Sequence, residues 1–250
     1  MNIFLSNDDG ITSSGLVKLA ERLSNKHNLL VVAPSTNCSA KAHSLTIGKT
    51  LTLLPSNEIP KVEAYSLSGT PVDCIKFAKL HFKNFNPDIV VAGINKEHNL
   101  GSDILYSGTV SIACEASFFN HISFAFSACN FSEEFSDIYP IYAEKIIDYL
   151  MPLSKSGDIW NINFPDLSLG DIKGARITKL GKHLYTDRYE KVGENQYKLV
   201  GELIDCPEND SDCDAELIKL GFITITPILF NKTNYEKLNK IESNLLNFEI

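Results

Sequence analysis

Residues 2–34 read NIFLSNDDGITSSGLVKLAERLSNKHNLLVVAP and predict a strand, a helix and a second strand in succession. Asn2 to Ser6 forms the first predicted strand. Leucines then recur three or four residues apart, the spacing of an amphipathic helix. Leu29 to Ala33 is a continuous apolar run that ends at Pro34, as expected for a strand buried on both faces of a parallel sheet. The segment therefore predicts one β-α-β unit.

The same alternation continues beyond this unit. Ile89 to Ala92 is a second continuous apolar run, which Gly93 ends. The other predicted strands are Thr46–Leu54, Ile122–Ser127 and Ile159–Phe164, and the other predicted helices are Pro71–Phe82, Thr109–Phe119 and Glu134–Leu150. Strands that alternate with helices are typical of a doubly wound, mostly parallel α/β sheet.

The pattern changes after Gly174. Arg176–Leu180, Tyr197–Ile204 and Phe222–Pro227 alternate with the period of a strand, and the last fifteen or so residues resemble a terminal helix. We therefore expect a core over residues 1–170. Residues 171–250 are expected to add an antiparallel hairpin or arm, further strands and a terminal helix that complete a single domain.

Composition limits the function and the location. A formal charge of −8 without a long cluster of Lys and Arg argues against a surface that binds a nucleic-acid polymer. The six cysteines form no C-x-x-C pair, so reduced thiols are expected. The first residues lack the pattern of a signal peptide, and no apolar stretch is long enough for a transmembrane helix. These observations predict a cytoplasmic protein that does not associate with membranes.

Polar side chains follow three of the predicted strands. Asp8 and Asp9 follow the first strand, Ser39 lies in the loop after the second, and Asn95 follows the run at Ile89–Ala92. Ligands of open α/β sheets bind at the carboxyl ends of the strands, so these residues are expected to converge. Two carboxylates, a hydroxyl and an amide suit a hard cation such as Mg²⁺ or Mn²⁺. A simple strand-ending turn at Asp8-Asp9-Gly10 is the alternative.

A second motif follows at Ser107-Gly108-Thr109, at the start of a predicted helix. Backbone N–H groups at a helix start, with glycine permitting close approach, can bind a phosphate. An ordinary Ser/Thr helix cap is the alternative. Together the cation site and the phosphate site predict phosphoryl-transfer chemistry, in which the cation neutralises phosphate charge.

These motifs occur in the order found in a known family. Ser6-Asn-Asp-Asp-Gly-Ile, Gly69-Thr-Pro-Val-Asp-Cys, Gly93-Ile-Asn, Asn99-Leu-Gly-Ser-Asp and Tyr106-Ser-Gly-Thr-Val resemble those of the SurE nucleotidase family. The resemblance is close over about the first 130 residues and looser to Ile225-Thr-Pro-Ile.

The resemblance implies a Rossmann-like core with an extended arm that builds a homodimer or homotetramer. It implies hydrolysis of nucleoside 5′- and 3′-monophosphates, and of short polyphosphates in some members. By the family pattern the metal ligands are Asp8, Asp9, Ser39 and Asn95, while Ser107, Gly108 and Thr109 lie against the substrate phosphate. Asp8, Asp9, Asn95 and Ser107 are thus the expected catalytic residues. We favour water over an aspartate as the attacking group, with Asp8 or Asp9 orienting it.

Three residues depart from the family pattern. Ala40 and Ala42 stand where the family usually has glycine and serine, which predicts a stiffer loop and one missing hydroxyl. Glu97 replaces a glycine, and its side chain or that of His98 could add a ligand or point to solvent, with solvent favoured. The remaining histidines, His183 among them, are expected at the surface or in packing. Tyr185, Tyr189 and Tyr197 lie in the presumed arm, where packing across a subunit interface is favoured over stacking on a base.

Two other functions fit part of the pattern. A family member that has lost turnover would bind metal and nucleotide without releasing phosphate. A phospho-receiver signalling domain also begins with a strand and an acidic pair. It needs a phosphoacceptor aspartate where this chain has Asn95, and this chain is about twice as long as a receiver domain.

Overall fold

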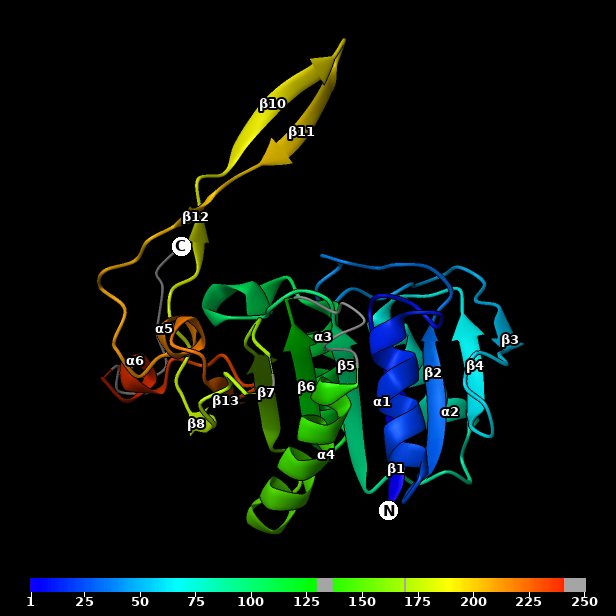
Figure 1. Cartoon of the computed structure of the whole chain (residues 1–250). Coiled ribbons are helices and arrows are strands. Elements are labelled where there is room, and N and C mark those ends of the chain that lie inside the picture. The colour runs from blue at the N-terminus through cyan, green and yellow to red at the C-terminus, as the bar shows by residue number, and fades with distance from the viewer. Residues whose placement is uncertain (130–136, 169, 241–250) are drawn as a thin grey trace, which may run out of the picture.

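One large sheet forms the centre of the molecule (Figure 1). The computed structural model describes residues 1–129, 137–168 and 170–240, and nine of the strands in these residues form a sheet in the order β3-β4-β2-β1-β5-β6-β7-β13-β8. These strands are β1 (Asn2–Ser6), β2 (Asn28–Pro34), β3 (Leu53–Pro55), β4 (Glu63–Leu67), β5 (Ile89–Asn95), β6 (Ile122–Ala128), β7 (Ile159–Phe164), β8 (Ala175–Ile177) and β13 (Ile223–Ile228). The run from β4 to β7 is parallel, and its order is that of a doubly wound fold. The predicted fold class is confirmed.

The middle residues of β1 and β2 are apolar because both faces of the sheet are covered. In β1, Ile3 and Leu5 pack into one core cluster, whereas Phe4 packs into another on the opposite face. In β2, Leu30 joins Phe4 while Val31 joins the first cluster. Successive side chains of a strand point to opposite faces, so a strand between two helical layers needs apolar residues at every position.

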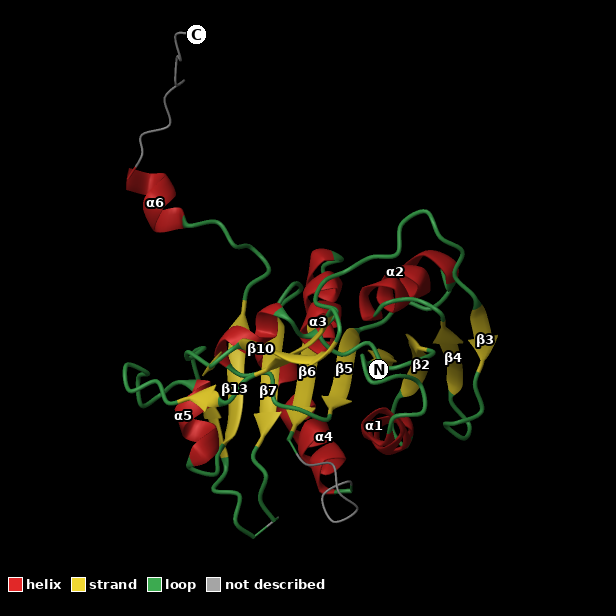
Figure 2. Ribbon diagram, turned by 90° about the horizontal axis from the view of Figure 1, so that it is seen from above, coloured by secondary structure: helices red, strands yellow, loops and turns green. Residues whose placement is uncertain are grey.

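Two layers of helices cover the sheet. Helices α1 (Ser14–Ser24) and α4 (Ile138–Leu150) lie on one face, and α2 (Pro71–His81) and α3 (Gly108–Phe118) lie on the other (Figure 2). Helix α2 begins with a capping box, because the Thr70 hydroxyl accepts from the Asp73 amide and the Asp73 carboxylate accepts from the Thr70 amide. Two short 3₁₀ helices, η1 (Gly101–Leu105) and η2 (Met151–Leu153), lie in connections.

The C-terminal part of the chain both completes the sheet and extends away from it. Strand β13 pairs antiparallel with β7, and β8 pairs parallel with β13. The remaining elements are β9 (Leu184–Tyr185), β10 (Arg188–Gly193), β11 (Gln196–Val200), β12 (Leu203–Ile204), α5 (Asp214–Lys219) and α6 (Tyr235–Lys240). The hairpin of β10 and β11 projects far from the core, in yellow in Figure 1.

The predicted strand at Thr46–Leu54 is wrong for most of its length. Only Leu53–Pro55 is a strand, and β4 at Glu63–Leu67 was not predicted. The amide of Thr46 donates to the Asp73 carboxylate at 3.1 Å instead of to a neighbouring strand. Gly48 turns the chain with a φ of +73°.

Two predicted helices lie partly outside the described residues. The predicted helix Glu134–Leu150 begins there, and its described part is α4. The part of the predicted terminal helix that follows α6 also lies outside the described residues. Across the described segments, no helix combines the length and the apolar character needed to cross a membrane.

Candidate active site

A cleft of about 730 Å³ opens at the carboxyl ends of β1 and β5. These strands are neighbours in the sheet, and chain connections run outward in opposite directions from them. Loops on the two sides of such a switch point diverge and leave a crevice. Five predicted site residues line the cleft together: Asp8, Asp9, Ser39, Asn95 and Ser107.

Asp8 is held firmly in the floor of this cleft. Its side chain is only 3% exposed, and its Oδ1 accepts a hydrogen bond of 2.6 Å from the Thr109 hydroxyl. Burial raises the pKa of Asp8, whereas the Thr109 hydroxyl and the first amides of α3 lower it. The backbone is fixed as well, because the Asp8 carbonyl accepts from the Cys38 amide at 2.7 Å.

Asp9 follows Asp8 in the chain, and its carboxylate is held by weaker hydrogen bonding. Burial first, and the charge of Asp8 second, raise the pKa of Asp9 to about 6, while Lys96 lowers it. Its Oδ1 accepts a long hydrogen bond of 3.4 Å from Asn37. Its Oδ2 is buried and has no hydrogen-bond partner among the described residues. A buried carboxylate oxygen without a partner raises the free energy of the folded protein unless a cation or a hydrogen-bond donor of the substrate binds to it.

The turn that carries these aspartates is built by Asn7. The amide of Gly10 donates to Asn7 Oδ1 at 3.2 Å, and Asn7 Nδ2 donates to the Gly10 carbonyl at 3.0 Å. Gly10 has a φ of +104°, which favours glycine. The predicted Asp-Gly turn is therefore present, and it coexists with the convergence of polar groups in the cleft.

Asn95 reaches the cleft from the end of β5. Its Nδ2 donates to the Glu97 carbonyl at 2.7 Å, so the side-chain oxygen is the atom left to bind a ligand. Gly93, two residues earlier, has a φ of +121°, and a Cβ there would lie 2.4 Å from the Phe126 carbonyl oxygen. Only glycine fits at that point, which explains the glycine of the Gly-Ile-Asn motif.

The start of α3 forms the opposite side of the floor. Ser107 caps the helix by accepting from the Val110 amide at 3.1 Å. A Cβ on Gly108 would lie 2.7 Å from the Asp8 Cβ, so glycine lets the helix approach the aspartate. Of the three predicted phosphate-binding residues, Ser107 lines the cleft, whereas Gly108 and the fully buried Thr109 lie behind Asp8.

The donor atoms fit a hard divalent cation. The carboxylates of the buried Asp8 and the half-buried Asp9 repel one another when both are ionised, and one of their oxygens lacks a partner in the part of the chain that the structure describes. No group of three or more His, Cys, Asp and Glu that could hold a metal occurs within residues 1–129, 137–168 and 170–240. The site would therefore use Asp8 and Asp9 with oxygen atoms of Ser39 and Asn95, a set that suits Mg²⁺ or Mn²⁺.

The three departures have different structural outcomes. Ala40 and Ala42 have φ values of +56° and +50°, a region that favours glycine. Glu97 is not among the positive-φ residues, so its backbone is unstrained. Its side chain is exposed, as favoured, and it also lines the cleft. His98 points inward, where its Nε2 lies 2.8 Å from the Phe164 carbonyl oxygen.

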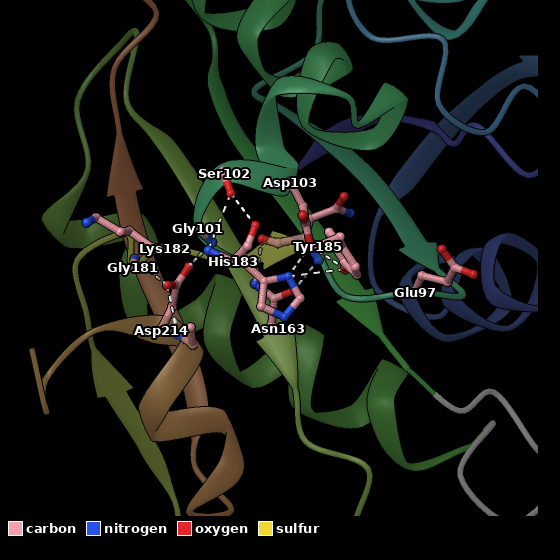
Figure 3. Close-up of polar contacts among 12 residues, drawn as sticks. Glu97, Gly101, Ser102, Asp103, Asn163, Gly181, Lys182, His183, Tyr185 and Asp214 are labelled. Carbon is pink, nitrogen blue, oxygen red and sulfur yellow. Dashed lines mark hydrogen bonds and ion pairs between the residues drawn. The ribbon is translucent and has the colours of Figure 1, made fainter. Parts of the chain in front are cut away.

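Sequence reasoning did not place Asp103 or His183 in the cleft, and it gave Tyr185 a ligand contact only as the alternative to subunit packing. Asp103, His183 and Tyr185 line one wall of the cleft and contact one another (Figure 3). Neither His183 nor Tyr185 has the spacing of a site motif, and Asp103 lies in the Asn99-Leu-Gly-Ser-Asp motif, to which the sequence analysis gave no role of its own. Their partners are about 80 residues away in the chain, so no local pattern could have identified them.

Comparisons with known proteins agree on one family. The model of "Survival protein SurE" matches residues 3–187. A 5′-nucleotidase SurE of Thermoanaerobacter sp. is 38% identical over 97% of this chain and 98% of its own. One of Clostridium botulinum is 39% identical, with coverage of 97% and 98%. The crystal structure of the SurE protein from Aquifex aeolicus superposes with a TM-score of 0.82 at 30% identity, covering 97% of this chain and 98% of that one.

Proposed function

The chain belongs to the SurE family of 5′-nucleotidases, and from this premise we propose that its cleft hydrolyses nucleoside monophosphates with one divalent cation held by Asp8, Asp9, Ser39 and Asn95. The cation is Mg²⁺ or Mn²⁺ in this proposal. The substrate class is nucleoside 5′-monophosphates, extended to 3′-monophosphates and short polyphosphates.

One observation carries the assignment of the site. The adjacent carboxyl groups of Asp8 and Asp9 lie in a cleft floor against the start of α3, and the Asp9 Oδ2 atom has no partner among the described residues. Such an arrangement is unfavourable for the protein alone, because desolvated carboxylates need a counter-charge. A bound cation removes the repulsion and supplies positive charge where a phosphate would lie.

The chain's own residues would divide the chemistry among them. A cation at this site, when bound, neutralises phosphate charge and stabilises the transition state. Asp8 or Asp9 orients the attacking water, and Ser107 holds a phosphate oxygen. Thr109 acts through Asp8, since its hydroxyl fixes that carboxylate. The P–O ester bond breaks as water adds to phosphorus, and the nucleoside leaves with the ester oxygen and takes up a proton.

A panel of nucleoside monophosphates, assayed with Mg²⁺, Mn²⁺ or chelator, tests the proposal. We expect phosphate release that needs the cation and falls at least about 100-fold in Asp8→Asn. The exposed Asp148 provides the matched control, because Asp148→Asn makes the same chemical change on α4. A folded wild type that binds nucleotides but releases no phosphate with either cation would instead identify a binding protein.

The other two functions have less support. The unstrained backbone at Glu97 removes one reason to expect lost turnover, although Ala40 and Ala42 remain in a region that favours glycine. A receiver domain would need an aspartate at the end of β5, where Asn95 stands.

A cytoplasmic location and a homo-oligomer complete the proposal. All six cysteines are free, which suits a reducing compartment. The projecting hairpin supports a homodimer or homotetramer, because a two-stranded hairpin is marginally stable in water without a packing partner. We also retain the division into a core over residues 1–170 and an arm over 171–250 that mediates assembly.

A further inference from the structure

We propose that Asp103, His183 and Tyr185 form the subsite that holds the sugar of the nucleotide. This inference rests on the proposed function and specifies which part of the substrate this wall of the cleft takes. We call the three residues the sugar subsite. They lie on η1 and at the base of the arm, whereas the cation ligands come from other loops.

The three side chains form a connected polar group. His183 Nδ1 lies 2.6 Å from Asp103 Oδ2, and the Tyr185 hydroxyl donates to the same oxygen at 3.4 Å. The Tyr185 hydroxyl also lies 3.3 Å from His183 Nδ1, and the two rings meet edge to face at 5.4 Å (Figure 3). Burial first, and Asp103 second, raise the pKa of Tyr185 to about 12, so this hydroxyl keeps its proton at neutral pH.

A buried aspartate fixes the position of this group. Asp214 is fully buried, and its carboxylate accepts from the Gly101 amide at 2.9 Å and from the Gly181 amide at 2.8 Å. A Cβ on Gly101 would lie 2.3 Å from the Gly181 carbonyl oxygen, so the two segments are in close contact. The two backbone segments therefore hold Asp103 and His183 together before a substrate binds, so binding does not have to order them.

Two polar atoms of the subsite remain for a ligand. Neither Asp103 Oδ1 nor His183 Nε2 makes a hydrogen bond within the residues that the structure describes. When His183 Nδ1–H donates to Asp103, Nε2 of the neutral ring is an acceptor. Asp103 Oδ1 and His183 Nε2 thus offer two separate acceptors on one wall of the cleft, and a ribose carries two neighbouring hydroxyl donors that can each meet one of them.

The charges of the cleft determine which end of the nucleotide lies at which wall. Among the described residues, Lys96 is the one Lys or Arg that lines the cleft, and its positive charge lowers the pKa of Asp9. The opposite wall carries the carboxylate of Asp103, whose charge helps to raise the pKa of Tyr185. With the proposed cation bound by Asp8 and Asp9, a phosphate is attracted to that end of the cleft and repelled by Asp103, whereas neutral hydroxyl groups are not repelled there. The phosphate therefore lies at the cation and the sugar at the subsite.

A second cation is the main competing occupant. The described residues contain no group of three or more His, Cys, Asp and Glu that could hold a metal, so Asp103 and His183 lack the further ligand that a cation would need. Neutral hydroxyl groups suit the available atoms better, because the only acidic ligand within the subsite is Asp103.

The test compares substrates with and without a sugar. Asp103→Asn and His183→Gln are assayed against a ribonucleoside 5′-monophosphate, its 2′,3′-dideoxy counterpart and p-nitrophenyl phosphate, at saturating Mn²⁺. We expect kcat/KM for the ribonucleotide, divided by that for p-nitrophenyl phosphate, to fall about 10- to 100-fold in each variant, mainly through KM. The wild type should prefer the ribonucleotide to the dideoxy compound, and the variants should lose that preference.

Several controls separate the possible outcomes. Equal losses on the two phosphate esters, or no sugar preference in the wild type, would overturn the sugar subsite while leaving the nucleotidase intact. A change in the number of bound Mn²⁺ ions in Asp103→Asn would favour the second cation and overturn the inference. If no substrate is hydrolysed, the proposed function fails. Calorimetric binding of the ribonucleotide and the dideoxynucleotide to each variant then decides the subsite separately, and Asp148→Asn should match the wild type throughout.

Discussion

Asp8 and Asp9 are adjacent in the chain, and both are partly or wholly removed from solvent at the end of a buried strand. Each ionised carboxylate raises the free energy of the other, and burial raises it further. The folded chain therefore holds a local arrangement that is unfavourable without a cation. Such arrangements are characteristic of functional sites, where stability is lost in exchange for binding.

The first prediction concerns stability without metal. The pKa of Asp9 is about 6 in the folded protein, above its ordinary value of 3.8, so the folded state binds more protons between these values. Its contribution to stability is therefore fully present below about pH 4 and is lost as the pH rises through about 6. In chelator, the free energy of unfolding should fall over this range, and Asp9→Asn should reduce the fall. Urea titrations from pH 4.5 to 7.5 measure it. Equal slopes in the wild type and Asp9→Asn, with Asp148→Asn as control, would contradict the prediction.

The second prediction concerns Ala40, whose φ is +56°. A left-handed backbone costs a residue with a Cβ about 1–2 kcal/mol, and glycine loses about 0.5–1 kcal/mol of this advantage through chain entropy. Ala40→Gly should therefore stabilise the protein by roughly 0.5–1 kcal/mol in chemical unfolding. Ala143 lies in the helical backbone of α4, so Ala143→Gly should destabilise it by about 1 kcal/mol or more. The same sign for both variants would show that strain at Ala40 is absent.

At the scale of elements, the site depends on how closely the start of α3 approaches Asp8, which follows β1. The helix can approach Asp8 because residue 108 has no side chain. Ser107 and Thr109 then hold the capped turn and the carboxylate together. The Ser-Gly-Thr tripeptide thus caps the helix and also contacts Asp8, so the helix cap does not conflict with the phosphate contact that we propose for Ser107.

The third prediction follows from this contact. Gly108→Ala places a Cβ about 2.7 Å from the Asp8 Cβ, so the aspartate or the helix must move. We expect Mn²⁺ affinity, measured by calorimetry, and nucleotidase activity to fall at least about tenfold, because small misplacements at a reacting centre are costly. A Cβ on Gly170 would meet nothing within 4 Å, so Gly170→Ala should behave as the wild type. Unchanged Mn²⁺ affinity in Gly108→Ala would mean that Asp8 does not bind the cation.

At the scale of the whole molecule, the hairpin of β10 and β11 lacks a core of its own. Its register places Tyr189 opposite Leu199 and Tyr197 opposite Lys191, so three apolar side chains share one face. Tyr189 is 72% exposed and Tyr197 is 61% exposed. A face of this kind on a projecting hairpin is typical of a contact between subunits.

The fourth prediction tests that assignment. The double variant Tyr189→Ser/Tyr197→Ser should lower the molar mass measured by light scattering at micromolar concentration, because the hairpin loses its apolar face. Tyr149 on α4 is exposed to a similar extent, 69%, so Tyr149→Ser is the matched control and should leave the mass unchanged. An identical mass for the double variant and the wild type would place the subunit contact elsewhere.

Much of this molecule could be predicted from the sequence, because the decisive signals are local. The apolar run Leu29–Ala33 requires cover on both faces, which selects a parallel sheet between helices. Asp8, Asp9 and Asn95 could be expected together, since neighbouring parallel strands bring their carboxyl ends to one edge. The error at Thr46–Leu54 arose where a contact with Asp73 and a turn at Gly48 override the alternating pattern.

The sequence by itself thus determined the fold class and the convergence of the aspartate pair with Asn95. Only the tertiary structure decided the position of Thr109 behind Asp8 and the wall made by Asp103, His183 and Tyr185. The pair Asp103 and His183 is separated by 80 residues, and the fully buried Asp214 joins the two backbone segments that carry it. Contacts of this kind depend on how distant segments pack, which no periodicity or motif in the chain encodes.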